Sequence, residues 1–246
     1  MSAMDLTARP VAHRGLHDAA AGVIENTASA VEAAVAAGYA IELDVQLTRD
    51  GEAVVFHDFT LDRLTQAQGR LADRTVAELK TVRFKATSDV MMTLPDLLAR
   101  VAGRALLVVE IKSDFSGDMR LVRRTAELAA AYNGPIALMS FDPDMVAEIG
   151  RRAPGVRRGI VAQRRYDHAE WDCVPPVRRK GLGLLLHWSR SRFQFVNYRV
   201  SDLDAPALRV VRAMGLPLLT WTVRTPQDRA LAASGADQIV FEGFRP

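Results

Sequence analysis

Short apolar runs alternate with amphipathic segments along most of this chain. Runs rich in aliphatic and β-branched residues predict strands at residues 9–13, 40–45, 53–57, 106–111, 136–139, 156–161, 182–186, 195–197, 217–223 and 238–241. Apolar residues at helical spacing predict helices at residues 28–37, 75–80, 94–102, 119–131, 143–151, 205–214 and 226–234. The order is therefore mostly strand then helix, repeated.

This alternation predicts an α/β fold with a closed parallel sheet. About eight apolar strands separated mostly by helices, in a chain of 246 residues, fit a (β/α)8 TIM barrel. A doubly wound open sheet is the competing fold, but no GxGxxG or phosphate-binding loop follows the first strand. Residues 58–92 are polar and too long for a plain connection, so we interpret them as a small cap inserted after the third strand. We expect a single domain over residues 1–246.

Composition places the chain among ordinary globular proteins. It is 49% hydrophobic and 25% charged, which excludes wholesale disorder. No apolar run approaches the roughly 18 residues of a membrane-spanning helix, so we expect no transmembrane segment. Residues 1–9 lack the basic and apolar regions of a signal peptide, and Cys173 is the only cysteine. Together these features favour the cytoplasm.

Positive charge is concentrated in one stretch, although the net charge is only +3. Residues 151–200 carry twelve Lys and Arg against three Asp and Glu, so the rest of the chain is net negative. One interpretation is attraction to anionic lipid or nucleic acid, including peripheral membrane contact. The other, which we favour, is a set of solvated loop and helix faces. Aromatic residues are not interleaved with the basic doublets as single-strand binding requires, so we expect no nucleic-acid partner.

Carboxylates stand at the ends of two predicted strands. Because side chains alternate along a strand, Glu42 and Asp44 point the same way, as do Glu110 and Lys112. In a parallel barrel the carboxyl ends of the strands face the active site, so the three carboxylates would converge there. Oxygen-only ligands favour Mg²⁺ or Ca²⁺ over Zn²⁺. One such pair alone would suggest salt-bridged strand ends, but the second strand with the same spacing favours a metal site.

Two histidines also stand at strand ends, His13 after the first strand and His57 after the third. Flanking a metal site, they suit an acid/base pair that works near neutral pH. Arg14 and Lys112 can hold phosphate oxygens, as a planar fork and as a point charge respectively. His17 lies off the strand, in the following loop, and is the weaker candidate.

These residues, taken together, resemble the glycerophosphodiester phosphodiesterase family. The resemblance rests on runs that match in order and spacing: His13-Arg14-Gly15, Glu25-Asn26-Thr27, Glu42-Leu43-Asp44-Val45, Asp50-Gly51, His57-Asp58, residues 61–65 and Glu110-Ile111-Lys112. It covers the N-terminal half well. Downstream it is carried by Ser140-Phe141, Trp221-Thr222-Val223 and residues 235–240, while residues 162–194 show no signature.

The resemblance implies a (β/α)8 barrel that hydrolyses a glycerophosphodiester to sn-glycerol 3-phosphate and an alcohol. It assigns roles as follows: metal ligands Glu42, Asp44 and Glu110; acid/base histidines His13 and His57; phosphate-binding Arg14 and Lys112; Trp221 against the glycerol; and Glu25 either supporting the site from behind or supporting the next helix. The cofactor would be a divalent cation, Mg²⁺ or Ca²⁺.

Three positions depart from the family pattern. Ile24 stands where a Pro is usual, Arg224 where an Asn is usual, and Phe241-Glu242 where a Thr-Asp pair is usual. None of these is a predicted metal ligand or catalytic histidine, so we expect hydrolysis. Arg224 and Glu242 leave the choice of substrate open.

Two alternatives to this function remain open. Within enzymes, the barrel could hydrolyse lysophospholipids in the manner of a lysophospholipase D, with its basic region near a membrane. Outside enzymes, it could bind a phosphate ligand or nucleic acid without catalysis. The oligomeric state stays open. We expect a small-molecule glycerophosphodiester as the principal partner.

Overall fold

The fold is a closed barrel of eight parallel strands, described here from a computed structural model for residues 5–246. The first four residues of the stretch assessed for a signal peptide lie outside the described part. The barrel strands are β1 (Val11–Ala12), β2 (Ala40–Leu47), β4 (Leu107–Ile111), β5 (Ile136–Ser140), β6 (Arg157–Ala162), β7 (Phe195–Arg199), β8 (Leu218–Val223) and β9 (Gln238–Phe241). Strand β1 pairs with both β2 and β9, which closes the ring. The predicted TIM barrel is therefore confirmed.

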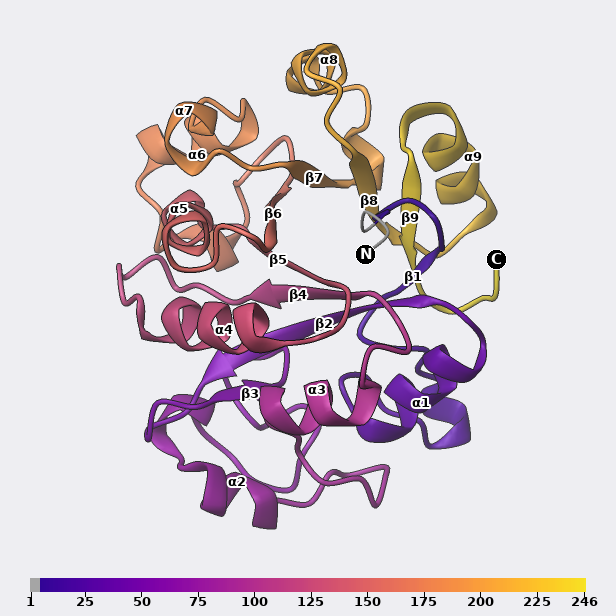
Figure 1. Ribbon diagram of the computed structural model, residues 1–246, viewed down its shortest axis with the longest axis vertical. Helices are drawn as coiled ribbons and strands as arrows, with labels where there is room; N and C mark the ends of the chain where they lie inside the picture. The colour runs from indigo at the N-terminus through magenta and orange to yellow at the C-terminus, as the bar shows by residue number, and fades with distance from the viewer. Residues whose placement is uncertain (1–4) are drawn as a thin grey trace.

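Helices surround this ring, as Figure 1 shows. They are α1 (Ala28–Ala36), α3 (Leu94–Val101), α4 (Arg120–Ala131), α5 (Pro143–Arg152), α6 (Pro176–Gly183), α7 (Trp188–Ser191), α8 (Pro206–Ala213) and α9 (Pro226–Gly235). Helices α3 and α9 each begin with a Thr and Asp that cap one another and a Pro in the first turn, which fixes where the helix starts. Helices α1, α3, α4, α5, α8 and α9 agree with predicted helices to within a few residues, whereas α6 and α7 were not predicted.

The alternation of side chains along β4 explains how one strand serves both the core and the pocket. Leu107, Val109 and Ile111 pack outward in the layer between strands and helices. Val108 points into the barrel, where it packs with inward residues of the other strands. Glu110, two residues further, points the same way and lines the pocket at the barrel mouth. The barrel interior is thus apolar along the middle of the strands and charged at their carboxyl ends.

A hairpin and an irregular segment lie outside the ring. Strand β3 (Ala53–Val55) pairs antiparallel with β2 across the Asp50-Gly51 turn, so it is the third strand in the chain but not a barrel strand. Residues 58–92 follow it and contain α2 (Val76–Thr81). They enclose a small apolar cluster with Ile24, Val54, Phe56, Leu61, Leu71, Leu79, Phe84 and Met91. In Figure 1 this segment lies at the lower side of the barrel, beside β2 and α3.

The strand predicted at residues 182–186 is wrong. The run Leu182–Leu186 forms the end of α6 and the turn after it. Leu182 and Leu185 are buried whereas Leu184 and Leu186 are exposed, which is the three-residue spacing of a helical face and not the alternation of a strand. Four leucines and a glycine in five positions do not by themselves distinguish a strand from a helix.

Within residues 5–246, every helix is too short or too polar to cross a bilayer. The cytoplasmic location suggested by the sequence stays a prediction.

Candidate active site

Three carboxylates meet at the barrel mouth because neighbouring strands place them in register. Asp44 on β2 lies opposite Glu110 on β4, and Glu42 comes two residues before Asp44 on the same face. One oxygen from each lies within 4.8 Å of the others, and all three side chains are buried. The structure therefore brings together the three predicted metal ligands.

Burial gives these acids unequal proton affinities. Burial, and then the charges of Asp44 and Glu110, raise the pKa of Glu42 well above its usual range. Burial also acts to raise the pKa of Asp44, but the charges of Lys112, His57 and Arg14 together outweigh it and lower that pKa. Glu42 thus holds its proton more tightly than Asp44 does.

Lys112 and Arg14 are the cations of the site. Lys112 Nζ lies 2.8 Å from Asp44 Oδ1 and 2.6 Å from Glu110 Oε1. Arg14 Nη1 donates to Glu25 Oε1 at 2.6 Å, and Arg14 Nε lies 3.5 Å from Asp44 Oδ2. Arg14 Nε is buried and makes no hydrogen bond within residues 5–246, so its contact with Asp44 is an ion pair only.

Each predicted catalytic histidine is held by a carboxylate at Nδ1. His13 Nδ1 donates to Glu242 Oε2 at 2.5 Å, and His57 Nδ1 donates to Asp58 Oδ1 at 2.7 Å. A carboxylate only accepts, so the proton sits on Nδ1 and the lone pair on Nε2. Burial lowers the pKa of His13. Both rings line the same pocket as the carboxylates.

Glu25 and Arg63 support this arrangement from one side. Arg63 Nε donates to Asp58 Oδ2 at 2.6 Å and Arg63 Nη2 donates to Glu25 Oε1 at 2.7 Å. Glu25 also accepts from Arg14, so it links the phosphate-binding candidate to the partner of His57. Asn26 Nδ2 donates to Asp44 Oδ2 at 3.0 Å. Of the two roles considered for Glu25, these contacts favour support of the site.

The opposite wall of the pocket is aromatic. Trp221 Nε1 donates to Asn197 O at 3.1 Å, and the Trp221 ring meets Phe141 edge-to-face at 5.5 Å. Phe141, Trp171 and Phe115 continue this surface. With the charged residues, they enclose a pocket of about 820 Å³ at the carboxyl ends of the strands. That volume is large enough for a diester with a sizeable alcohol.

Sequence reasoning missed several residues of this pocket. Asp58 had a visible signal, since it follows His57 directly. Glu242, which holds His13 from outside the pocket lining, was noted only as a departure from the family pattern. Gln163 and Asn197 line the pocket, and each has a buried side-chain atom that makes no hydrogen bond within residues 5–246. Trp171 comes from the stretch without any family signature. No sequence signal identified these last three.

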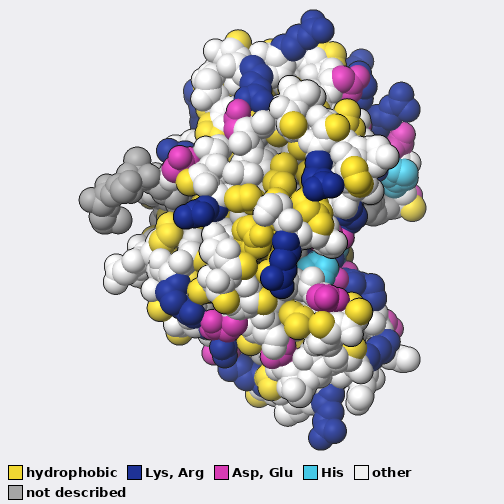
Figure 2. Space-filling model, turned by 90° about the vertical axis from the view of Figure 1, so that its right-hand side faces the viewer, with side chains coloured by type: hydrophobic (Ala, Val, Ile, Leu, Met, Phe, Trp, Pro, Cys, Tyr) yellow, Lys and Arg dark blue, Asp and Glu magenta, His cyan; other side chains and the backbone are white. Residues whose placement is uncertain are grey.

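Six of the twelve basic residues at 151–200 form ion pairs with acids within residues 5–246. The ion pairs are Arg151 and Arg152 with Glu148, Arg164 with Asp204, Arg178 and Arg190 with Asp144, and Arg179 with Asp172. Figure 2 shows another face of the molecule, toward α1 and α9, and there too Lys and Arg are spread among Asp and Glu. These observations favour the interpretation as solvated faces.

Comparisons of this chain with a family model and with individual proteins all point to the same family. The model of the glycerophosphoryl diester phosphodiesterase family matches residues 13–242. A glycerophosphodiester phosphodiesterase of Caldanaerobacter subterraneus is 32% identical over 163 residues, 62% of this chain and 66% of that protein. Human glycerophosphodiester phosphodiesterase 1 is 27% identical over 249 residues, 89% of this chain and 73% of that protein. An uncharacterized Bacillus subtilis protein is 33% identical over 65% of its length, so this match and the Caldanaerobacter match each span just under two thirds of the relative.

Solved structures share the fold. A phosphodiesterase of Oleispira antarctica, solved with its product sn-glycerol-3-phosphate, superposes with a TM-score of 0.75 at 21% identity, covering 94% of this chain and 91% of that one. A glycerophosphodiester phosphodiesterase of Thermotoga maritima superposes with a TM-score of 0.69 at 23% identity, covering 95% and 94%. The family match over residues 13–242 leads to one conclusion: this chain belongs to the glycerophosphoryl diester phosphodiesterase family.

Proposed function

We propose that this enzyme hydrolyses a glycerophosphodiester to sn-glycerol 3-phosphate and an alcohol, with a bound divalent cation. The observation that carries the proposal is the convergence, in one pocket, of three buried carboxylates and two histidines that are each held by a carboxylate. Family membership supports the reaction class. Residues 1–246 would form one domain, with residues 58–92 as its cap.

The carboxylates fit a hard divalent cation. Glu42, Asp44 and Glu110 offer oxygen donors within 4.8 Å of one another, the ligand chemistry that Mg²⁺ and Ca²⁺ prefer. The raised pKa of Glu42 shows that burial and neighbouring charge disfavour its ionised form, as expected where a cation is needed to balance the site. When bound, the cation would supply positive charge to a phosphate oxygen.

The histidines would move the protons. With Nδ1 committed to a carboxylate, each ring offers Nε2 to the pocket, one to accept a proton from the attacking oxygen and the other to protonate the leaving alcohol. Arg14 and Lys112 would stabilise the charge that develops on the phosphate oxygens. Trp221 would pack against the glycerol or a neighbouring part of the substrate.

The aromatic wall favours a second candidate substrate class. Phe115, Phe141, Trp171 and Trp221 could pack against the acyl chain that a lysophospholipid carries on its glycerol. This candidate shares the phosphodiester chemistry and the headgroup alcohol as leaving group. It differs in the acyl chain on the glycerol, which stays with the phosphate.

A single panel tests both candidates. Glycerophosphocholine, glycerophosphoethanolamine and a lysophospholipid are incubated with the enzyme, with and without EDTA. We expect release of sn-glycerol 3-phosphate from the first two, loss of activity in EDTA, and recovery with Mg²⁺ or Ca²⁺. Full activity in EDTA contradicts the metal role, and turnover of the lysophospholipid alone replaces the first substrate class with the second.

A further inference from the structure

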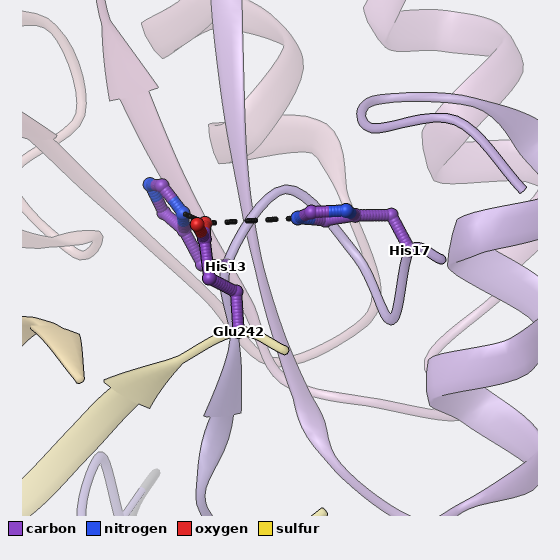
Figure 3. A group of neighbouring side chains, drawn as sticks. All are labelled: His13, His17 and Glu242. Carbon is purple, nitrogen blue, oxygen red and sulfur yellow. Dashed lines mark hydrogen bonds and ion pairs between the residues drawn. The ribbon is translucent and has the colours of Figure 1, made fainter. Parts of the chain in front are cut away.

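His13, His17 and Glu242 form a second cluster of metal-ligating groups, distinct in chemistry from the three carboxylates. Their donor atoms lie within 4.8 Å of one another. Figure 3 shows the carboxylate of Glu242 between the two imidazole rings, with both rings directed toward it. His17 Nε2 lies 3.7 Å from the Glu242 Oε2 atom that accepts from His13.

The donor set differs in kind from that of the carboxylate site. Two imidazole nitrogens and one carboxylate oxygen suit Zn²⁺ and similar borderline ions, whereas three carboxylates suit Mg²⁺ and Ca²⁺. His17 Nε2 is buried and makes no hydrogen bond within residues 5–246, and it faces Glu242 Oε2 at 3.7 Å, too far for a hydrogen bond. The other oxygen of Glu242 accepts from Arg224 Nε at 2.5 Å, which would orient the carboxylate as outer partners orient metal ligands.

The backbone around His17 is fixed in a way that keeps its ring near Glu242. Gly15 has a φ of +80°, and a Cβ there would lie 2.8 Å from the Cβ of Ala30. Leu16 N donates to Ala30 O at 2.9 Å, which ties the same turn to α1. In a tetrahedral zinc site neighbouring donors are about 3.3 Å apart, given zinc–ligand bonds of about 2.0–2.1 Å. The separations of the two histidine nitrogens from Glu242 Oε2, 2.5 and 3.7 Å, bracket that value, so one would widen by about 0.8 Å and the other shorten by about 0.4 Å.

We propose that His13, His17 and Glu242 bind a Zn²⁺-like ion that inhibits the enzyme. The ion would bind Nδ1 of His13 in place of its proton. A neutral imidazole whose Nδ1 holds a metal carries its remaining proton on Nε2, where it points toward Glu42 at 3.9 Å. The lone pair that faces the pocket is then lost, and His13 can no longer exchange a proton with substrate.

The binding half of this proposal is independent of the proposed function, and the inhibition half rests on it. Binding is measured by titrating Zn²⁺ against a chromophoric chelator, with Mg²⁺ in excess. Three variants are compared with the native chain: His17→Ala removes one ligand of the new site, Glu110→Gln weakens the carboxylate site, and His168→Ala removes an exposed histidine at the pocket rim as a control.

We expect Zn²⁺ to bind Glu110→Gln and His168→Ala as tightly as the native chain, and His17→Ala about 100-fold more weakly. Loss of groups that merely orient ligands costs about 10- to 100-fold in affinity, so loss of a ligand should cost at least as much. Co²⁺ in place of Zn²⁺ should give the intense visible bands of a four-coordinate site in the native chain and lose them in His17→Ala. Equal Zn²⁺ affinity in the native chain and His17→Ala overturns the site.

Inhibition is then measured with Mg²⁺ present at saturation. We expect Zn²⁺ to inhibit the native enzyme and His168→Ala alike, and the concentration for half inhibition to rise at least tenfold in His17→Ala. If His17→Ala loses zinc binding but inhibition is unchanged, the site exists and its regulatory role is wrong. If neither Mg²⁺ nor Ca²⁺ supports any diester hydrolysis while the binding result holds, the proposed function fails and the zinc site stands.

Discussion

The pocket has two halves, which are built from different strands and lined by different kinds of side chain. On the β1, β2 and β4 side, carboxylates, histidines and cations are tied into one another at 2.5–2.8 Å. On the β6, β7 and β8 side, the wall is aromatic, and the buried side-chain atoms Gln163 Nε2 and Asn197 Oδ1 make no hydrogen bond within residues 5–246. The first half is committed to chemistry on a phosphate, whereas the second leaves room for different alcohols.

The charged half should also be the less stable half when no cation is bound. Three buried carboxylates near one another repel, and only partly balancing cations hold them together. Functional sites of this kind commonly lower the free energy of unfolding, because the arrangement needed for activity is not the most stable one. The aromatic half, in contrast, is stabilised by edge-to-face ring contacts such as that of Tyr166 with Trp171, whose centroids are 4.7 Å apart. Substitutions in the charged half should therefore lower activity while raising the stability of the metal-free protein. Substitutions in the aromatic half should lower stability more than activity.

Glu42→Gln should give the largest effect. We expect kcat to fall by about three orders of magnitude or more, and the metal-free protein to melt higher than the native chain. Native Glu42 binds its proton more tightly than the unfolded chain does, so its stabilisation is complete below its ordinary pKa of 4.5 and is lost as pH rises through the raised value. Glu42→Gln carries no ionisable group at this position, so its stability does not fall in this way as the pH rises. Melting curves in EDTA between pH 4.5 and 8 measure it, and about 2–4 °C corresponds to 1 kcal/mol in a chain of this size.

If the native chain and Glu42→Gln melt in parallel across that pH range, the carboxylate is not held at a raised pKa. If activity persists in Glu42→Gln, the residue is not a metal ligand. Val108→Ala, which changes an inward residue below the site, serves as the control that lowers stability without removing a charge.

His13→Ala and His57→Ala should each reduce kcat by about 10²- to 10⁴-fold, because each removes one proton-transfer group. The fold should be retained, as measured by circular dichroism. His17→Ala, assayed without zinc, should keep near-native kcat, since its imidazole contacts Glu242 at 3.7 Å and is not among the groups that line the catalytic pocket. Near-native kcat in either of the first two variants would show that residue to be misassigned.

The fold and the charged half could be read from sequence because their signals are local. Glu42 and Asp44, like Glu110 and Lys112, sit two residues apart on a strand, and that spacing alone places each pair on one face. Glu242 could not be assigned this way, since its contact with His13 joins residues 229 positions apart. The aromatic half depends on loops after β5 and β6, whose course no periodicity specifies. The place of Trp171 in the pocket could therefore not be predicted from the sequence.

Glu242→Gln should cost less than loss of either histidine. The amide can still accept from His13 Nδ1, but it lacks the charge that favours a proton moving onto the ring. We expect kcat to fall about tenfold with KM nearly unchanged, because Glu242 acts through His13 and does not line the pocket. Asp58→Asn is the matched variant at His57. Steady-state kinetics that show a higher KM at constant kcat would indicate a substrate contact instead.

Arg224→Asn should give the smallest effect, on the choice of alcohol. The departure of Arg224 from the family's Asn suggested a preference for anionic headgroups, yet Arg224 is about half exposed, at 54% of its side chain, and pairs with Glu242 Oε1. That partner neutralises much of its charge, so we expect kcat/KM for an anionic diester relative to glycerophosphocholine to fall only about twofold. Salt should shrink the difference further, because screening acts over about 8 to 10 Å at physiological ionic strength. A shift of tenfold or more would place the guanidinium against the substrate. The charged half would then contribute to the choice of alcohol, which we otherwise assign to the aromatic half alone.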